Sequence, residues 1–218
     1  MSIDTILIHP GYCMPISHYA CMAQANTVIF EALDNYQKQS YRTRTKIATA
    51  SGMLQLTIPI KHNRTSKKHQ LTFEVQLENK FHWQRDHWRS LKVAYQTSPF
   101  FEYYEDSFEP LYTTVYDKLI DFNLACHETI MECLQLEKDS IYTEEYFRNP
   151  KPPMTNLRHL ITSKKEPDYK LPEYHQLFHD KHGYLPNLSI LDLLFNEGPN
   201  ALSYLENVDL STMIAQNH

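Results

Sequence analysis

The first 33 residues place two short apolar runs on either side of a stretch that suits a helix, and this pattern limits the fold more than any other feature. Residues 6–8 are apolar and predict a strand, which residues 9–15 interrupt with two prolines and a glycine. Residues 16–25 then suit a helix, and residues 27–33 (TVIFEAL) are β-branched and aromatic enough for a second strand. Strands joined through a helix form a parallel βαβ unit, so we expect an α/β fold.

The following segments predict more strands and then mostly helices. Residues 40–47 alternate in character, and together with residues 50–60 they predict a hairpin that turns at Gly52. Residues 71–77 (LTFEVQL) predict a further strand. Helical spacing begins at Trp83 and ends before Pro99, residues 110–136 predict one long amphipathic helix, and residues 188–195 carry another helical stripe.

These elements predict a single α/β domain over residues 1–218. Its N-terminal βαβ-type unit and further strands form a mixed sheet, and a predominantly helical C-terminal half follows. The expected parts are a strand-rich region at 1–80, a helical region at 81–148, a proline-rich connector at 149–172 and C-terminal helices at 173–218. A chain of 218 residues, 42% of them hydrophobic, can bury a sizeable core without disulfides.

Composition disfavours several function classes. The formal net charge of -5 provides no overall basic field, so we expect no general nucleic-acid binding and only a local anion site. The start lacks the basic flank and apolar run of a signal peptide, and the four cysteines form no C-x-x-C pair, which favours reduced thiols in the cytoplasm. Without an apolar stretch of roughly 18 residues, we expect a soluble protein with no membrane span.

The turn at residues 9–15 has three possible roles: a metal site, a phosphate cradle, or a bend between strand and helix. The residues in and after this turn that could bind a metal are His9, Cys13, His18 and Cys21. Their spacings match no common zinc pattern, which favours buried thiols over a metal site. A turn into a helix N-terminus presents free amides to an anion, and Gly11 would allow close approach, so Gly11 and Tyr12 are candidate ligand-binding residues.

A nucleotidyltransferase signature, G-x-x-x-P-x-H-x-G-H, offers a comparison for this turn. Gly11 and Pro15 have its spacing, but Ser17 and Ala20 stand at its two histidine positions. Those histidines stabilise the charge on the transferring phosphate, so standard nucleotidyl transfer lacks its chemistry here. The chain also contains no legible nucleophile elbow or Walker loop, which disfavours standard hydrolysis of esters or ATP.

Cations on one side of the strand at 40–47 are the second candidate site. If this segment is extended throughout, Arg42, Arg44 and Lys46 share one face, with Lys38 just upstream. Such a set can clamp a phosphate, pyrophosphate or carboxylate. The alternative is a solvated edge that discourages strand pairing.

Two histidine-containing segments remain. In WQRDHWRS, His87 is a candidate general base beside Trp88, although aromatic packing around a hydrogen-bonded histidine is the alternative. In YHQLFHDKHG, His175, His179 and His182 have spacings of 4 and 3. A metal site there is the less favoured interpretation, since the third histidine lies where a glycine ends the helix.

Several of these motifs together resemble the WbqC-like protein family over most of the chain. They are the G-Y-x-x-P turn at residues 11–15, the K-x-S-Y-R-x-R segment at 38–44 and the H-W-R-S-L-x-x-A-Y-x-x-S-P-F-F block at 87–101. The resemblance implies a role in making or modifying a glycan precursor for surface polysaccharide. It favours a functional role for Lys38, Arg42 and Arg44. His9 stands where many relatives carry a different polar residue, and it is assigned no role.

Two hypotheses follow. The first is a cytoplasmic protein that binds an anionic small molecule, nucleotide-linked or phosphorylated, and acts as a transferase on a glycan precursor. The second is a non-catalytic interaction module whose aromatic surface docks a partner, using Phe100, Phe101, Tyr103 and Tyr104. Exposure of that aromatic block would favour the second hypothesis, and its burial would favour the first.

Overall fold

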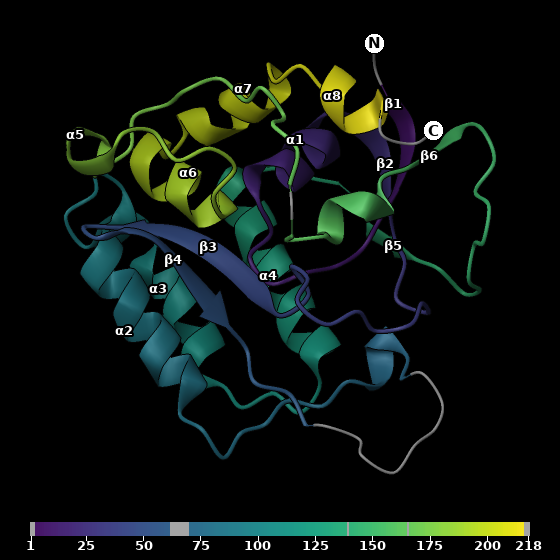
Figure 1. The fold of residues 1–218 in the computed structure, drawn as a ribbon, viewed down its shortest axis with the longest axis horizontal. Helices are drawn as coiled ribbons and strands as arrows, with labels where there is room; N and C mark the ends of the chain where they lie inside the picture. Colours follow the sequence, from purple (N-terminus) through teal and green to yellow (C-terminus); the bar gives the residue numbers. More distant parts are fainter. Residues whose placement is uncertain (1–2, 62–69, 139, 165, 216–218) are drawn as a thin grey trace.

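The predicted βαβ unit forms the core of a parallel sheet in the computed structural model, which describes residues 3–61, 70–138, 140–164 and 166–215 (Figure 1). Strand β1 (Ile3–Ile8) leads through helix α1 (Ile16–Gln24) to strand β2 (Ala25–Phe30), and the two strands pair in parallel with Ile6 opposite Val28. Strands β5 (Ser140–Tyr142) and β6 (Met154–Asn156) complete the sheet in the order β5-β2-β1-β6. The α/β fold class is confirmed.

The predicted hairpin forms a sheet of its own. Strands β3 (Arg44–Thr49) and β4 (Gly52–Thr57) are antiparallel, and Gly52 has a φ of 103°, a conformation that glycine adopts readily. The first strand begins at Arg44 and not at residue 40, because residues 41–43 form a turn. In Figure 1 this hairpin lies between helices α2 (Trp83–Tyr95) and α6 (Ile190–Glu197), and both contact β3.

Two predictions between residues 71 and 136 are wrong for one shared reason. Residues 71–77 contain the short 3₁₀ helix η1 (Thr72–Glu74) where a strand was expected, and the long helix is two helices, α3 (Phe101–Thr113) and α4 (Leu119–Leu134). The chain leaves the helix between them to bond with the earlier segment: Leu77 N donates to Asp117 O, and Leu119 N donates to Val75 O, both at 2.9 Å. Backbone pairing between distant segments outweighs the local periodicity.

The expected connector and the preceding helical region also contain regular structure. Residues 149–172 include β6 and the 3₁₀ helix η2 (Arg158–Ile161), and β5 lies within the region predicted as helical. Each of these strands has three residues, too few to show an alternating pattern. They are strands because they pair with β1 and β2.

Helices surround the two sheets. Helix α4 reaches the parallel sheet through His127, whose ring meets Phe30 of β2 at 4.9 Å, and α1 packs against α7 (Asn200–Glu206). Two short helices, α5 (His179–His182) and α8 (Ser211–Ile214), complete the C-terminal part. Among the described residues, every helix is too short or too polar to cross a lipid bilayer.

Candidate functional site

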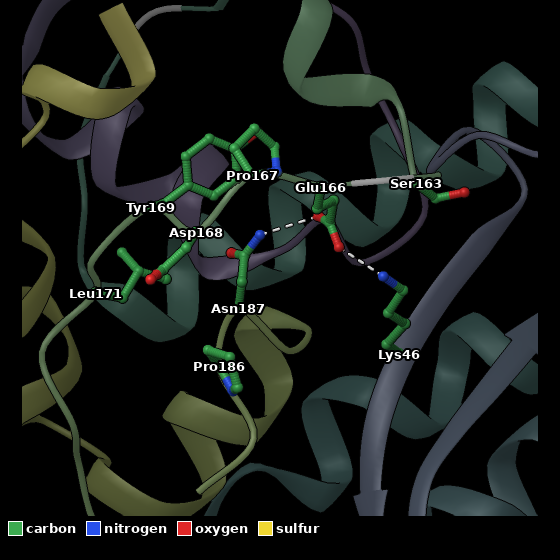
Figure 2. Close-up of a pocket in the computed structure, with 9 residues that line it drawn as sticks. All are labelled: Lys46, Ser163, Glu166, Pro167, Asp168, Tyr169, Leu171, Pro186 and Asn187. Atoms are coloured by element: carbon green, nitrogen blue, oxygen red, sulfur yellow. Dashed lines mark hydrogen bonds and ion pairs between the residues drawn. The ribbon is translucent and has the colours of Figure 1, made fainter.

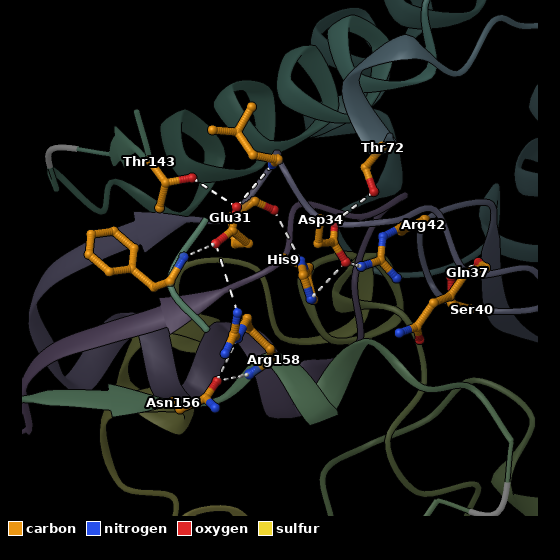
Figure 3. Close-up of polar contacts among 12 residues, drawn as sticks. His9, Glu31, Asp34, Gln37, Ser40, Arg42, Thr72, Thr143, Asn156 and Arg158 are labelled. Carbon is orange, nitrogen blue, oxygen red and sulfur yellow. Dashed lines mark hydrogen bonds and ion pairs between the residues drawn. The ribbon is translucent and has the colours of Figure 1, made fainter. Parts of the chain in front are cut away.

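A polar or charged residue follows each strand of the parallel sheet at its carboxyl end. His9 follows β1, Glu31 follows β2, Thr143 follows β5, and Arg158 lies two residues after β6. Because the strands are parallel, these residues meet at one edge, where Figure 3 shows them converging. Together with Asp34, Arg42 and Thr72, they are called the edge cluster below.

Glu31 is the most enclosed acid of the edge cluster. Its side chain is fully buried, and its carboxylate accepts hydrogen bonds from Leu33 N at 2.9 Å, Thr143 Oγ1 at 3.0 Å and Phe147 N at 3.3 Å. Arg158 lies 3.8 Å from the same carboxylate. Three donors and a nearby cation satisfy this buried charge, so Glu31 ties the loop after β5 to the sheet.

His9 lies at the middle of the edge cluster. Its Nδ1 is 3.0 Å from the Glu31 carbonyl oxygen, and its Nε2 is 3.4 Å from Asp34 Oδ2. A carbonyl can only accept, so the Nδ1 of a neutral His9 carries the proton and Nε2 is left as a base. Burial, and then the charge of Arg42, lower the pKa of His9 well below its usual value, which keeps the ring neutral.

Asp34 and Arg42 form a buried ion pair beside His9. Arg42 Nη2 donates to Asp34 Oδ2 at 2.5 Å, and Thr72 Oγ1 donates to Asp34 Oδ1 at 2.7 Å. Arg42 is fully buried, yet its Nε and Nη1 have no hydrogen-bond partner among the described residues. Buried donors of a charged group are seldom left unsatisfied, and the described residues leave these two nitrogens unused.

Arg158 provides a second guanidinium at the solvent side of the edge cluster. Its side chain is 12% exposed, and its Nη1, like the two nitrogens of Arg42, lacks a hydrogen-bond partner within the described ranges. Its Nε donates to Asn156 Oδ1 at 2.9 Å, and its guanidinium lies 5.3 Å from the centre of the Tyr146 ring. The positive charges of both Arg42 and Arg158 act on His9.

The position of the edge cluster in the sheet is the one at which open α/β folds bind ligands. The chain order changes direction at β1, since β2 lies on one side of it and β6 on the other. Ligands of such sheets bind outside the carboxyl ends of the strands at this point. His9 and Arg158 flank it directly.

The predicted turn at residues 11–15 lies against other parts of the chain. Tyr12 N donates to Tyr41 O at 2.8 Å, and a Cβ on Gly11 would lie 2.8 Å from the same oxygen. At the start of α1, Ile16 N donates to Leu188 O at 3.0 Å, and Ser17 N donates to Asn187 Oδ1 at 2.9 Å. A phosphate would have to displace these partners, and ligand binding by Gly11 and Tyr12 stays a prediction.

The predicted base His87 and its neighbour Trp88 lie in the aromatic core. His87 Nδ1 is 3.0 Å from the Tyr12 hydroxyl, and burial lowers the pKa of His87 to about 4. Trp88 stacks on Tyr112 with 5.3 Å between ring centres. The structure therefore brings together Tyr12, His87 and, through Tyr112, Trp88, but it buries all of them.

The prediction that three cations share one strand face is wrong for Arg42, whereas Arg44 and Lys46 lie two residues apart on β3 and share a face. Only Arg44 and Lys46 belong to β3, whereas Arg42 precedes it in the turn and points into the edge cluster. Lys46 instead pairs with Glu166 at 2.5 Å. Lys38 is exposed, and its part in ligand binding, like that of Arg44, stays a prediction.

The remaining histidine and aromatic candidates do not converge. His182 Nε2 lies 3.0 Å from the Thr49 carbonyl oxygen, and the described part of the chain contains no group of three or more histidine, cysteine or carboxylate residues arranged to hold a metal ion. In the aromatic block, Phe101 and Tyr104 are buried, Phe100 is half-buried, and Tyr103 alone is largely exposed at 74%. The contiguous aromatic surface required by the interaction hypothesis does not form.

Comparison with protein families gives one result. A family model for WbqC-like proteins matches residues 10–165 and 165–204. The chain belongs to the WbqC-like protein family. No curated protein and no solved structure matches it.

The motifs behind the WbqC-like resemblance have different places in the fold. The segment at 38–44 brings Arg42 to the edge cluster, and the block at 87–101 forms α2 and the start of α3, where its aromatic residues pack into the core. The turn at 11–15 holds α1 against residues 41 and 187–188. Of the ligand-binding residues predicted for this WbqC-like chain, Arg42 is therefore the one whose side chain lies in the edge cluster.

Six residues of the edge cluster had no role in the sequence analysis: His9, Glu31, Asp34, Thr72, Thr143 and Arg158. A sequence signal was present for His9, which follows the apolar run that predicts the first strand. Glu31 lies inside the second strand as predicted at 27–33, and only the end of β2 at Phe30 places it at the edge of the sheet. Arg158 follows a strand of three residues that only pairing reveals, and Asp34 is recognisable only through its contact with Arg42.

Proposed function

We propose that this protein binds an anionic small molecule at the edge cluster and acts, in the cytoplasm, as a transferase on a phosphorylated or nucleotide-linked glycan precursor. Arg42 and Arg158 provide the positive charge, and His9 provides the base. The glycan assignment depends on WbqC-like family membership, and the anion assignment depends on the residues of the edge cluster.

The unsatisfied guanidinium nitrogens carry the proposal. Two nitrogens of Arg42 and one of Arg158 are buried and lack hydrogen-bond partners in the described part of the chain. A phosphate or carboxylate oxygen accepts such hydrogen bonds, often two from one guanidinium. The ligand enters past Arg158, since its side chain is the most exposed of the charged members, at 12%.

His9 is suited to proton transfer because it is neutral and has a fixed tautomer. With the proton held on Nδ1 by the Glu31 carbonyl, Nε2 can accept a proton from a nucleophilic hydroxyl or amine of the acceptor substrate. Asp34, 3.4 Å from this nitrogen, then stabilises the imidazolium that forms. The bound anion and the two arginines would orient the other substrate.

A ligand panel on matched variants tests the anion site. Thermal unfolding is measured with inorganic phosphate, pyrophosphate, UDP and a nucleotide sugar, with a free hexose as the uncharged control. A ligand at 100 times its Kd stabilises the native state by about 2.7 kcal/mol. We expect a phosphorylated ligand to raise Tm in the wild type and to lose this effect in Arg158→Gln.

Arg85→Gln is the matched control, because Arg85 is exposed on α2 and, of the residues that the structure describes, pairs only with neighbouring Asp86. It should retain the full ligand effect. Absence of stabilisation by every anion, or equal stabilisation of wild type and Arg158→Gln, would refute the site. With a ligand identified, His9→Gln should retain binding and lose turnover, whereas equal turnover would exclude His9 as the base.

A further inference from the structure

A cavity of about 380 Å³ lies outside the edge cluster and shares no lining residue with it. Three segments of the chain form its walls: β3, the segment after η2, and the residues before α6 (Figure 2). Small-molecule sites range from roughly 300 to 1,000 Å³, so this cavity has the size for a small ligand.

An ion pair stands on the wall of this cavity. Lys46 Nζ lies 2.5 Å from Glu166 Oε2, each side chain is 16% exposed, and both residues line the cavity. Figure 2 shows Lys46 and Glu166 pointing toward each other from opposite segments. The other acid of the lining, Asp168, pairs with Lys170 at 2.5 Å. The cavity therefore presents one positive and one negative group side by side.

Asn187 holds the acidic member of the pair in place. Its Nδ2 donates to Glu166 Oε1 at 3.0 Å, while its Oδ1 accepts from Ser17 N at the start of α1 at 2.9 Å. Both ends of the amide are thus used, and the position of Glu166 is tied to a helix. A site built on such a support keeps its geometry when a ligand enters.

The wall behind Lys46 contains an unsatisfied hydroxyl. The Tyr41 side chain is fully buried, Lys46 Nζ lies 5.3 Å from the centre of its ring, and its hydroxyl has no hydrogen-bond partner among the described residues. Burial, followed by the nearby Glu166 carboxylate, raises the pKa of Tyr41, so the hydroxyl stays protonated. Tyr41 does not line the cavity, so its neutral ring packs behind Lys46 and adds no charge to the site.

From this arrangement we infer that the cavity binds a small zwitterion, a free amino acid or a close analogue, with Lys46 on the carboxylate and Glu166 on the ammonium. A simple anion would be repelled by Glu166, and a simple cation by Lys46. A zwitterion replaces one ion pair by two and leaves no charge unpaired. The apolar lining is positioned for the ligand's side chain: Pro167, Tyr169, Leu171 and Pro186.

Calorimetric titration of the full chain tests this inference with three matched probes. The probes are L-phenylalanine, phenethylamine, which lacks the carboxylate, and 3-phenylpropionate, which lacks the ammonium. A panel of glycine, leucine, glutamate and lysine covers other side chains. We expect at least one amino acid to bind, with a Kd about tenfold or more below those of its amine and acid analogues, since each missing ion pair costs over 1 kcal/mol.

Two isosteric variants assign the roles. Lys46→Met should weaken amino-acid binding and abolish the preference over the amine, and Glu166→Gln should abolish the preference over the acid. Lys80→Met is the control, because Lys80 is exposed and does not line the cavity. Circular dichroism verifies that each variant is folded.

Binding of the amine or the acid as tightly as the amino acid would overturn the inference, as would unchanged affinity in both variants or no binding by any amino acid. The inference is independent of the anion site. Arg158→Gln should leave amino-acid binding unchanged, so failure of one site is distinguishable from failure of the other.

Discussion

Asp34 and Arg42 meet at 2.5 Å in a buried ion pair next to His9, and the pair determines the charge balance of the edge cluster. Burial raises the pKa of Asp34 and lowers the pKa of Arg42, and the charge of each partner opposes the effect of burial on the other. The charge of each residue therefore offsets part of the cost of burying the other.

Removal of Asp34 should destabilise the protein strongly. Asp34→Ala leaves the Arg42 guanidinium buried without its counter-charge, and breaking a buried pair in this way costs about 3–5 kcal/mol. The free energy of unfolding from urea denaturation measures the loss. Lys170→Ala, which breaks the exposed pair with Asp168, should cost about 1 kcal/mol or less, and comparable losses in both variants would contradict the assignment.

Gly11→Ala should destabilise the protein by steric conflict. The added Cβ would lie 2.8 Å from Tyr41 O and 3.1 Å from Ile161 Cδ1, and a backbone oxygen cannot move aside as a flexible side chain does. Overpacking of this kind costs about 1–3 kcal/mol.

Gly52→Ala provides the contrast in the same urea measurement. A Cβ at Gly52 meets no atom within 4 Å, and its φ of 103° makes the cost purely conformational, about 1–2 kcal/mol. Adding Ile161→Ala to Gly11→Ala should not restore stability, since the clash of the new Cβ with Tyr41 O remains. Full relief of Gly11→Ala by Ile161→Ala would show that the clash with Tyr41 O is unimportant.

Stability should fall as the solution becomes acidic, because buried histidines resist protonation. Burial lowers the pKa of His87 and of His127 to about 4, below an unfolded value near 6.5. Between these values the unfolded chain binds protons that the folded chain does not, so stability is complete above pH 6.5 and decreases toward pH 4. Each histidine contributes up to about 3 kcal/mol to this decrease.

His87→Gln tests the assignment, because glutamine can bond to the Tyr12 hydroxyl but cannot titrate. The variant should show a smaller loss of unfolding free energy than the wild type between pH 7 and pH 4.5. His175→Gln, at an exposed position, is the control. Identical pH profiles for wild type and His87→Gln would show that His87 takes up its proton with similar ease in both states.

Asp192→Asn should loosen the segment before α6. Tyr95 and Tyr174 donate their hydroxyls to the two Asp192 carboxylate oxygens at 2.6 and 2.5 Å, and Gln176 Nε2 lies 3.3 Å from Oδ2. An amide replaces one of these acceptors by a donor, so one buried hydroxyl loses the acceptor for its proton at a cost of about 1–3 kcal/mol.

Hydrogen exchange locates this effect. Amides of residues 174–185 should exchange faster in Asp192→Asn. Amides of β1 and β2 should lose no more protection than the decrease in the free energy of global unfolding accounts for. Glu173→Gln, at an exposed neighbouring position, should leave exchange unchanged. Equal protection of residues 174–185 in wild type and Asp192→Asn would contradict the proposed tether.

The sequence by itself determined those elements whose pattern is sustained over many residues. The βαβ unit, the hairpin, α2 and α6 follow from local periodicity and from glycine and proline positions, and the structure confirms them. It also indicated Arg42 as a candidate, through a motif shared with WbqC-like proteins.

Tertiary structure decided the rest, because the deciding contacts join residues far apart in the chain. Strands β5 and β6 exist through pairing with β2 and β1, and the break between α3 and α4 exists because residues 75–77 bond to residues 117–119. His9 and Arg158 become neighbours only when parallel strands end at one edge, and Lys46 meets Glu166 across 120 residues. Local periodicity records which face of an element is buried, but it contains no information on which distant side chain lies opposite.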